Sequence, residues 1–109
     1  MEKQKQPEDY YSVEITDKTL RISRPFQDDQ VIDLDEIEEI RMVNTDRGPV
    51  EPDVWLVLSG NGKHCGIPQG SEGWTAVYDI VSKYPGFDFE QVIQSAACTE
   101  NRVFDLWKK

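Results

Sequence analysis

The sequence has few cysteines, few basic residues and no long apolar run, and each shortage disfavours a class of protein. Two cysteines, Cys65 and Cys98, are too few for a disulfide scaffold, and neither lies in a Cys-x-x-Cys pair. No stretch approaches the ~20 apolar residues that a membrane-spanning helix needs, and residues 1–10 are polar. We therefore expect no signal peptide, no membrane segment and a cytoplasmic protein.

Basic residues are the second shortage. Lys and Arg number 12 against 21 Asp and Glu, which gives a formal net charge of -9. A field of this sign repels nucleic acid phosphates and anionic lipid headgroups, so we expect no nucleic acid partner and no membrane partner. Residues 28–39 contain no base and hold the densest acidic cluster, which consists of Asp28, Asp29, Asp33, Asp35, Glu36, Glu38 and Glu39.

Sequence signatures of catalysis are also lacking. There is no phosphate-binding glycine loop, nucleophile elbow, metal-ligand spacing or coenzyme fingerprint. His64 and Cys65 are adjacent in an expected strand, so their side chains should project to opposite faces, whereas the position of Cys98 relative to His64 stays open. An EF-hand loop starting at Asp28 would place Asp33 where that loop needs glycine. We expect a non-enzymatic protein with no catalytic residue, metal or cofactor.

The length and apolar content predict one folded domain. A chain of 109 residues cannot divide into two cores of adequate size, and its 38% hydrophobic content suffices for one. Residues 1–9 read as a flexible tail, and residues 10–109 as the domain.

The first two thirds of the chain read as strands. Alternation predicts a hairpin over residues 11–22 and strands around residues 31–34 and 40–44, with a corner at residues 35–37. Residues 46–53 hold Gly48, Pro49 and Pro52 and are expected to form a loop. An apolar run over residues 54–58 and a return strand over residues 63–67 flank Asn61-Gly62, a strong hairpin signal.

Two helices and a final strand are expected after residue 70. Apolar residues recur with helical spacing from Trp74 to Tyr84, and Asp88 is placed to cap a second helix over residues 89–97. Val92, Ile93, Ala96 and Ala97 give this second helix an apolar side, on which the small alanines predict close approach to a neighbour. Residues 102–107 predict a last strand of open register.

This order predicts an α+β domain with a bent, mostly antiparallel sheet of about six to seven strands, an amphipathic helix and a second short helix. Residues 31–40 and the order of elements resemble a bacterial pleckstrin-homology-like domain. Residues 46–55, 67–70, 85–88 and 104–107 resemble a group of small, functionally uncharacterised bacterial proteins. The resemblance spans roughly residues 10–109 and implies a fold without catalytic residues.

The acidic cluster has two interpretations, a solvated face that keeps the sheet soluble or a docking surface for a basic partner. In the docking hypothesis Lys and Arg side chains of the partner pair with two groups of carboxylates, and Trp55 can serve as an apolar anchor. The first group is Asp33, Asp35, Glu36, Glu38 and Glu39, and the second is Asp46, Glu51 and Asp53. Trp107 is a second candidate anchor, while Trp74 is expected in the core.

Small size, acidity and the lack of disulfides are typical of bacterial immunity proteins, which neutralise nuclease toxins by presenting carboxylates where nucleic acid phosphates would lie. The most concrete hypothesis is therefore an immunity protein for a basic, nuclease-type toxin, whose C-terminal domain would be the partner. The alternative is a pleckstrin-homology-like adaptor or scaffold domain that binds a peptide or associates with itself.

Overall fold

The structure is a computed structural model that describes residues 10–45, 54–98 and 100–109. The expected tail and the whole of the expected loop over residues 46–53 lie outside these ranges. The elements in chain order are β1 (Ser12–Thr16), β2 (Thr19–Arg24), β3 (Gln27–Asp33), the 3-10 turn η2 (Leu34–Glu36), β4 (Glu39–Asn44), β5 (Val54–Gly60), β6 (Lys63–Pro68), α1 (Trp74–Val81), α2 (Phe89–Ala97) and β7 (Arg102–Lys108).

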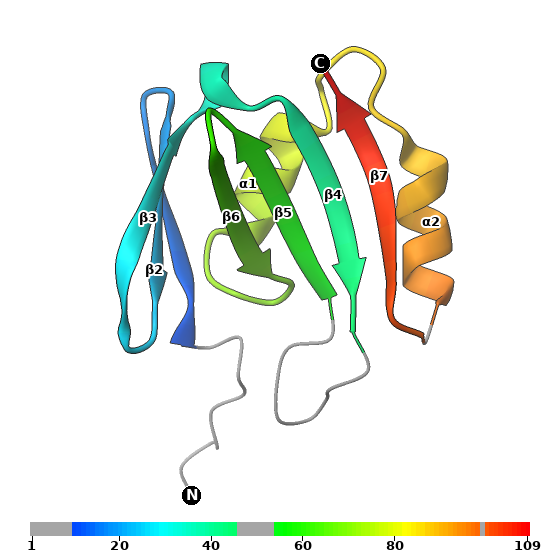
Figure 1. Cartoon of the computed structure of the whole chain (residues 1–109), viewed down its shortest axis with the longest axis horizontal. Helices are drawn as coiled ribbons and strands as arrows, with labels where there is room; N and C mark the ends of the chain where they lie inside the picture. Colours follow the sequence, from blue (N-terminus) through cyan, green and yellow to red (C-terminus); the bar gives the residue numbers. More distant parts are fainter. Residues whose placement is uncertain (1–9, 46–53, 99) are drawn as a thin grey trace, which may run out of the picture.

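The fold is α+β, as predicted, but the strands form two antiparallel sheets where one bent sheet was expected. The first has the order β1-β2-β3 and the second the order β6-β5-β4-β7. β3 and β6 lie side by side where the sheets meet (Figure 1), and the side-chain amide of Gln30 donates to the carbonyl of His64 across this seam at 2.9 Å. None of the described helices is long and apolar enough to cross a membrane.

Turn chemistry explains the connections between the strands. Asn61 and Gly62 adopt φ of 51° and 75°, which suits a two-residue hairpin loop and confirms the predicted hairpin. The expected corner at residues 35–37 is present as η2 and the residue after it. Phe26, at φ 59°, follows Pro25 in the β2–β3 turn, where its side chain is fully exposed.

The core lies between the two sheets and α1, which covers the inner face of the four-stranded sheet (Figure 1). Strand alternation supplies most of it, because every second residue points inward. Its fully buried large side chains include Leu20, Ile22, Ile32, Ile37, Ile40, Leu56, Leu58, Ile67, Phe104 and Leu106. Trp74 is half-buried against this core and stacks on Tyr78 with ring centroids 5.4 Å apart.

The first helix is shorter than predicted, whereas the second begins where the sequence places it. α1 ends at Val81, although the apolar spacing continues to Tyr84, which packs its ring edge-on against Trp107 beyond the helix end. α2 begins as predicted, because the Asp88 carboxylate accepts hydrogen bonds from the amides of Glu90 and Gln91 at 3.1 and 3.2 Å.

The predicted inward side of α2 was wrong for three of its four residues, since only Val92 packs against the core. Ser95 is buried and Val92 is half-buried, whereas Ile93 is 69% exposed and both Ala96 and Ala97 are exposed. The physical reason is a buried polar contact, in which the Ser95 hydroxyl donates to the side-chain oxygen of Asn44 at 2.6 Å. This bond turns the polar side of α2 toward β4 and the apolar side outward.

The final strand is present and its open register is now defined. β7 pairs antiparallel with β4, with Val103 opposite Val43 and a bulge between Ile40 and Arg41. β7 therefore forms one edge of the four-stranded sheet, beside α2 (Figure 1).

Candidate functional site

A shallow hollow of about 670 Å³ lies at the end of the molecule where the β1–β2 turn meets η2. We call it the acidic hollow, and its lining consists of Asp17, Lys18, Thr19, Asp33 and Asp35. Three carboxylates face one ammonium group, so the lining carries a formal excess of two negative charges. A positively charged side chain is the ligand that this electrostatic pattern favours.

Local hydrogen bonds fix the shape of the acidic hollow. Asp17 occupies the left-handed region at φ 52°, which aspartate tolerates and the tight β1–β2 turn requires. The Thr19 hydroxyl donates to the Asp33 carboxylate at 2.7 Å across the β2–β3 pair. The amide of Leu34 donates to the carbonyl of Lys18 at 2.7 Å, which ties η2 to the turn. The carboxylates are therefore held by backbone elements that cannot easily move apart.

Asp35 is the most available carboxylate of the acidic hollow. Its side chain is 80% exposed, and its ion pair with Lys18 is long at 3.9 Å, with the lysine side chain 75% exposed. Such an exposed pair contributes little and is easily exchanged for another cation. Glu38, two residues beyond η2, is also exposed, while its backbone is fixed by hydrogen bonds to Ser59 and Lys109.

Glu36, one of the predicted docking residues, is engaged within the chain. Its carboxylate accepts hydrogen bonds from the Asn61 side chain at 2.7 Å, the Asp33 amide at 3.1 Å and the Lys63 ammonium at 3.4 Å. These partners favour the charged form, and the bond from Asn61 contributes most to holding the pKa of Glu36 below its ordinary value of 4.5. Glu36 thus clamps η2 to the β5–β6 hairpin.

The lowered pKa of Glu36 predicts a pH dependence. Because the folded state binds this proton less tightly than the unfolded state, the stabilisation is fully present above about pH 4.5 and is lost as the pH falls through the lowered folded pKa. Replacing Asn61 with glycine keeps the left-handed turn residue and removes the main donor, so the pKa of Glu36 should rise. NMR titration of the carboxyl carbon measures both values, and a wild-type pKa at or above 4.5 would contradict the clamp.

Glu39 is also engaged within the chain. It forms ion pairs with Arg41 and, at 3.9 Å, with Lys108, while Arg41 also contacts Asp105 at 3.2 Å. These bases neutralise the Glu39 carboxylate, so it adds less to the negative field than its neighbours do. The structure brings all five predicted docking carboxylates between residues 33 and 39 to one end of the molecule. Asp35 and Glu38 are the most exposed of those not held by close partners.

Trp55 lies away from these carboxylates. Strand register places Glu39 opposite Ser59 and Val43 opposite Trp55, so four residues of strand separate the two rows, a distance of roughly 13 Å. Trp55 and the acidic hollow therefore do not form one compact patch. The second predicted group of docking carboxylates, which consists of Asp46, Glu51 and Asp53, lies outside the described residues.

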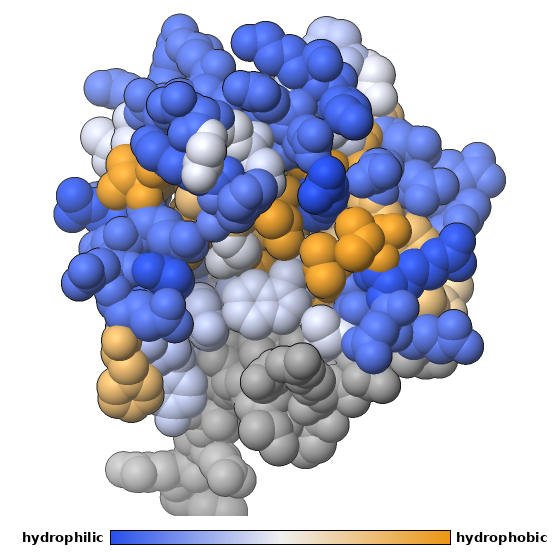
Figure 2. All heavy atoms as spheres, viewed as in Figure 1, coloured by the Kyte–Doolittle hydropathy of each residue, from blue (hydrophilic) through white to orange (hydrophobic). Residues whose placement is uncertain are grey.

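The surroundings of Trp55 are apolar. Its ring meets Tyr11 edge-on at 5.3 Å and lies over Gly66, where an added Cβ would approach the indole to 3.2 Å. On the same outer face of the four-stranded sheet, Val43, Val57 and Val103 alternate with buried core residues. Figure 2 shows hydrophobic atoms in the middle of this view, with hydrophilic atoms dominating above them.

A second cleft, of about 420 Å³, lies beside the β5–β6 hairpin. Its wall contains Ser59 and His64, which are cross-strand partners, with the serine oxygen 2.9 Å from Nδ1 of the imidazole. Our prediction from sequence missed this pair, although a two-residue loop at Asn61-Gly62 would have placed Ser59 opposite His64. A hydroxyl beside an imidazole is the start of a nucleophile–base arrangement, but the neighbouring Glu39 is held by Arg41 and Lys108 and does not orient the ring.

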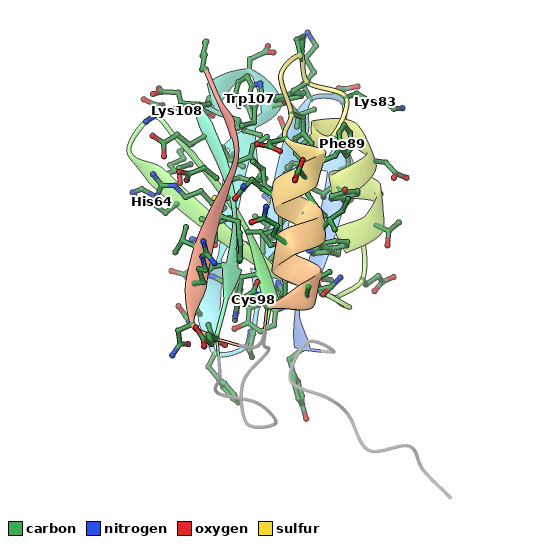
Figure 3. The ribbon with its side chains drawn as sticks, turned by 90° about the vertical axis from the view of Figure 1, so that its right-hand side faces the viewer. His64, Lys83, Phe89, Cys98, Trp107 and Lys108 are labelled. Atoms are coloured by element: carbon green, nitrogen blue, oxygen red, sulfur yellow. The ribbon has the colours of Figure 1, made fainter. Side chains whose placement is uncertain are left out.

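Neither cysteine side chain lies beside His64, because the adjacent Cys65 is buried on the other face of β6 and Cys98 follows α2. Cys65 is buried, and burial raises the pKa of its thiol. Cys98 follows α2 on the inner side of the sheet, where its carbonyl accepts from Asn44, whereas His64 is exposed on the opposite face (Figure 3). The structure therefore separates Cys98 from His64, the proximity that had stayed open.

Metal binding and relationships to known proteins were also tested. In the ranges that the structure describes, no group of three or more His, Cys, Asp or Glu side chains could hold a metal ion. Comparison with protein-family models, with curated proteins and with solved structures finds no match to this chain.

Proposed function

We propose that this protein is a small acidic protein-binding domain of the cytoplasm that docks a basic partner at the acidic hollow. The observation that carries the proposal is the grouping of Asp17, Asp33 and Asp35 around one exposed lysine in a hollow of about 670 Å³. The hollow is open to solvent, and among the described residues Asp35 has a long, exposed pair with Lys18 that a partner cation can replace.

The net charge of -9 supports the same class of partner. A concentrated negative field accelerates encounter with a basic protein and repels acidic ones, so it supplies both rate and selectivity. Glu38 extends the negative surface beyond η2, while Lys63 is occupied by Glu36.

The most specific form of this proposal is an immunity protein that neutralises a basic, nuclease-type bacterial toxin. The cleft of such a nuclease is basic because it binds phosphates, and rigidly held carboxylates can occupy the same positions. The Thr19–Asp33 bond holds the Asp33 carboxylate, and the tie between η2 and the β1–β2 turn fixes the backbone that carries Asp17 and Asp35, which lowers the entropy cost of association.

Charge reversal at Asp35 in the acidic hollow and at Glu38 beside it tests this proposal. We expect the double variant Asp35→Lys, Glu38→Lys to lower the association rate with the partner at least about tenfold and to flatten its salt dependence, with the free energy of unfolding within about 0.5 kcal/mol of wild type. The partner is isolated from the native organism at low ionic strength, identified, and titrated against the purified protein by surface plasmon resonance and in a nuclease-inhibition assay.

The matched control is Glu72→Lys, Asp79→Lys, which makes the same change in net charge at exposed positions in and just before α1. This control should weaken binding only through the change in the net charge of the protein, and therefore less than the variant at Asp35 and Glu38. Equal rates for both double variants would mean that the partner does not use the acidic hollow, and a captured protein without nuclease activity would contradict the immunity function while leaving protein binding intact.

The alternative function is a pleckstrin-homology-like adaptor that adds a strand of its partner to a sheet edge. Contacts at the edges compete with this mode, because the Val13 amide donates to the Glu72 carbonyl at 2.9 Å and the Leu106 carbonyl accepts from the Asp88 amide at 2.7 Å. The acidic hollow is therefore the better-supported docking site.

A further inference from the structure

The outward side of α2 is apolar, although the side that packs on the sheet is partly polar. Phe89 is 54% exposed and Ile93 69% exposed, and both Ala96 and Ala97 are exposed. Helical geometry places these four side chains within an arc of about 100°. Figure 3 views α2 from outside the sheet, with Phe89 at its first turn and Cys98 just beyond its last.

This arrangement reverses the usual orientation of an amphipathic helix. The inward side holds Ser95, whose hydroxyl and carbonyl are both bonded to Asn44, so the core does not take up the apolar stripe. Phe89 is also held in position, since its ring packs against Phe87 with centroids 4.9 Å apart. An ordered apolar stripe that no described segment of the chain covers is typical of an interaction surface.

We propose that the stripe binds a second copy of this chain, with two α2 helices packed antiparallel across a two-fold axis at Ile93. In that pairing Phe89 of one copy lies opposite Ala97 of the other, and Ile93 meets its own equivalent. The stripe has its largest side chain at one end and its smallest at the other, so it is complementary to itself in this orientation.

Charge supports a second copy at this position. Two molecules that each carry -9 repel one another, and contact is least unfavourable where carboxylates are absent. α2 contains one charged residue, Glu90, and antiparallel pairing places it opposite Ala96 of the other copy, away from the other Glu90. Gln94, which lies beside Glu90 at the edge of the stripe, is neutral.

The size of the stripe sets the expected strength. Four side chains of one short helix cover much less than the ~800 Å² per partner of a standard interface. The dimer should accordingly be weak, with a dissociation constant on the order of 10–100 μM. α2 lies at the edge of the molecule opposite the β1–β2 turn (Figure 1), so dimerisation leaves the acidic hollow accessible.

Sedimentation velocity of the full chain from about 5 μM to about 1 mM tests the dimer, because this range covers about two decades around the expected constant. We expect reversible self-association, which Ile93→Glu should weaken at least about 30-fold because it places two carboxylates on the axis. Phe26→Glu is the matched control, since it adds the same charge at a fully exposed apolar residue outside α2. A wild-type monomer throughout, or equal loss with both variants, would overturn the proposal.

A size exchange tests the antiparallel pairing itself. Ala97→Phe should weaken the dimer, because two phenylalanines then meet at each end, and Phe89→Ala combined with Ala97→Phe should restore it with the sizes reversed. If Ala97→Phe instead strengthens association, the stripe associates through nonspecific apolar contact and the proposed antiparallel pairing is wrong. Asp35→Lys, Glu38→Lys should still dimerise, which separates this result from the fate of the proposed function.

Discussion

Replacing Gly60 with alanine should destabilise the domain by about 3 kcal/mol or more. An added Cβ would overlap the Glu36 carbonyl oxygen and lie 2.8 Å from the carbonyl carbon. The Gly60 and Glu36 backbones cannot move apart. Gly60 is buried at the end of β5, and the chain just after η2 is held by the hydrogen bond from the Glu38 amide to the Ser59 carbonyl at 2.7 Å. Urea denaturation monitored by tryptophan fluorescence measures the change.

The matched control for Gly60 is Gly62 in the same hairpin. No atom lies within 4 Å of its added Cβ, but its φ of +75° is unfavourable for alanine, so Gly62→Ala should cost only about 1 kcal/mol. A similar loss for both variants would show that the close approach of η2 to β5 is unimportant. If η2 instead moves away in Gly60→Ala, the pKa of Glu36 should rise toward its ordinary value as Asn61 and the carboxylate separate.

Replacing Asn44 with leucine should cost about 3 kcal/mol, although the volumes are similar. The Asn44 amide donates to the carbonyls of Ser95 at 2.8 Å and Cys98 at 3.2 Å, and its oxygen accepts from the Ser95 hydroxyl. Asn44 and Ser95 are both buried, so leucine leaves three polar groups at the end of α2 without these partners. The free energy of unfolding in urea measures the loss.

A double-mutant cycle identifies the cause of that loss. Ser95→Ala removes one donor and should cost about 1–2 kcal/mol, while the combination of Asn44→Leu with Ser95→Ala should cost less than the sum, because the hydroxyl that leucine leaves unpaired is then absent. Strict additivity of the two variants would mean that the Asn44–Ser95 bond does not hold α2 on the sheet. Hydrogen exchange of the α2 amides should accelerate in Asn44→Leu before that of the strands.

The candidate site was only partly predictable. The high density of carboxylates over residues 28–39 is visible in the sequence. The sequence does not show that these carboxylates lie at two different ends of β3. β3 carries Asp28 and Asp29 near its start and Asp33 at its other end, so the run is split between the two ends of a strand. The occupation of Glu36 by Asn61 and of Glu39 by Arg41 and Lys108 depends on strands brought together by folding.

The sequence by itself determined the local structure: the hairpin at Asn61-Gly62, the cap at Asp88 and the alternation that buries Ile40 and Met42. These features depend on neighbours a few residues away, whose preferences act within one turn or strand. Only the tertiary structure decided that β7 pairs with β4 and that α2 turns Ser95 inward, because the partner Asn44 lies 51 residues from that serine. A buried hydrogen bond between distant residues outweighs a local apolar pattern, since leaving its groups unpaired costs more than exposing a few methyl groups.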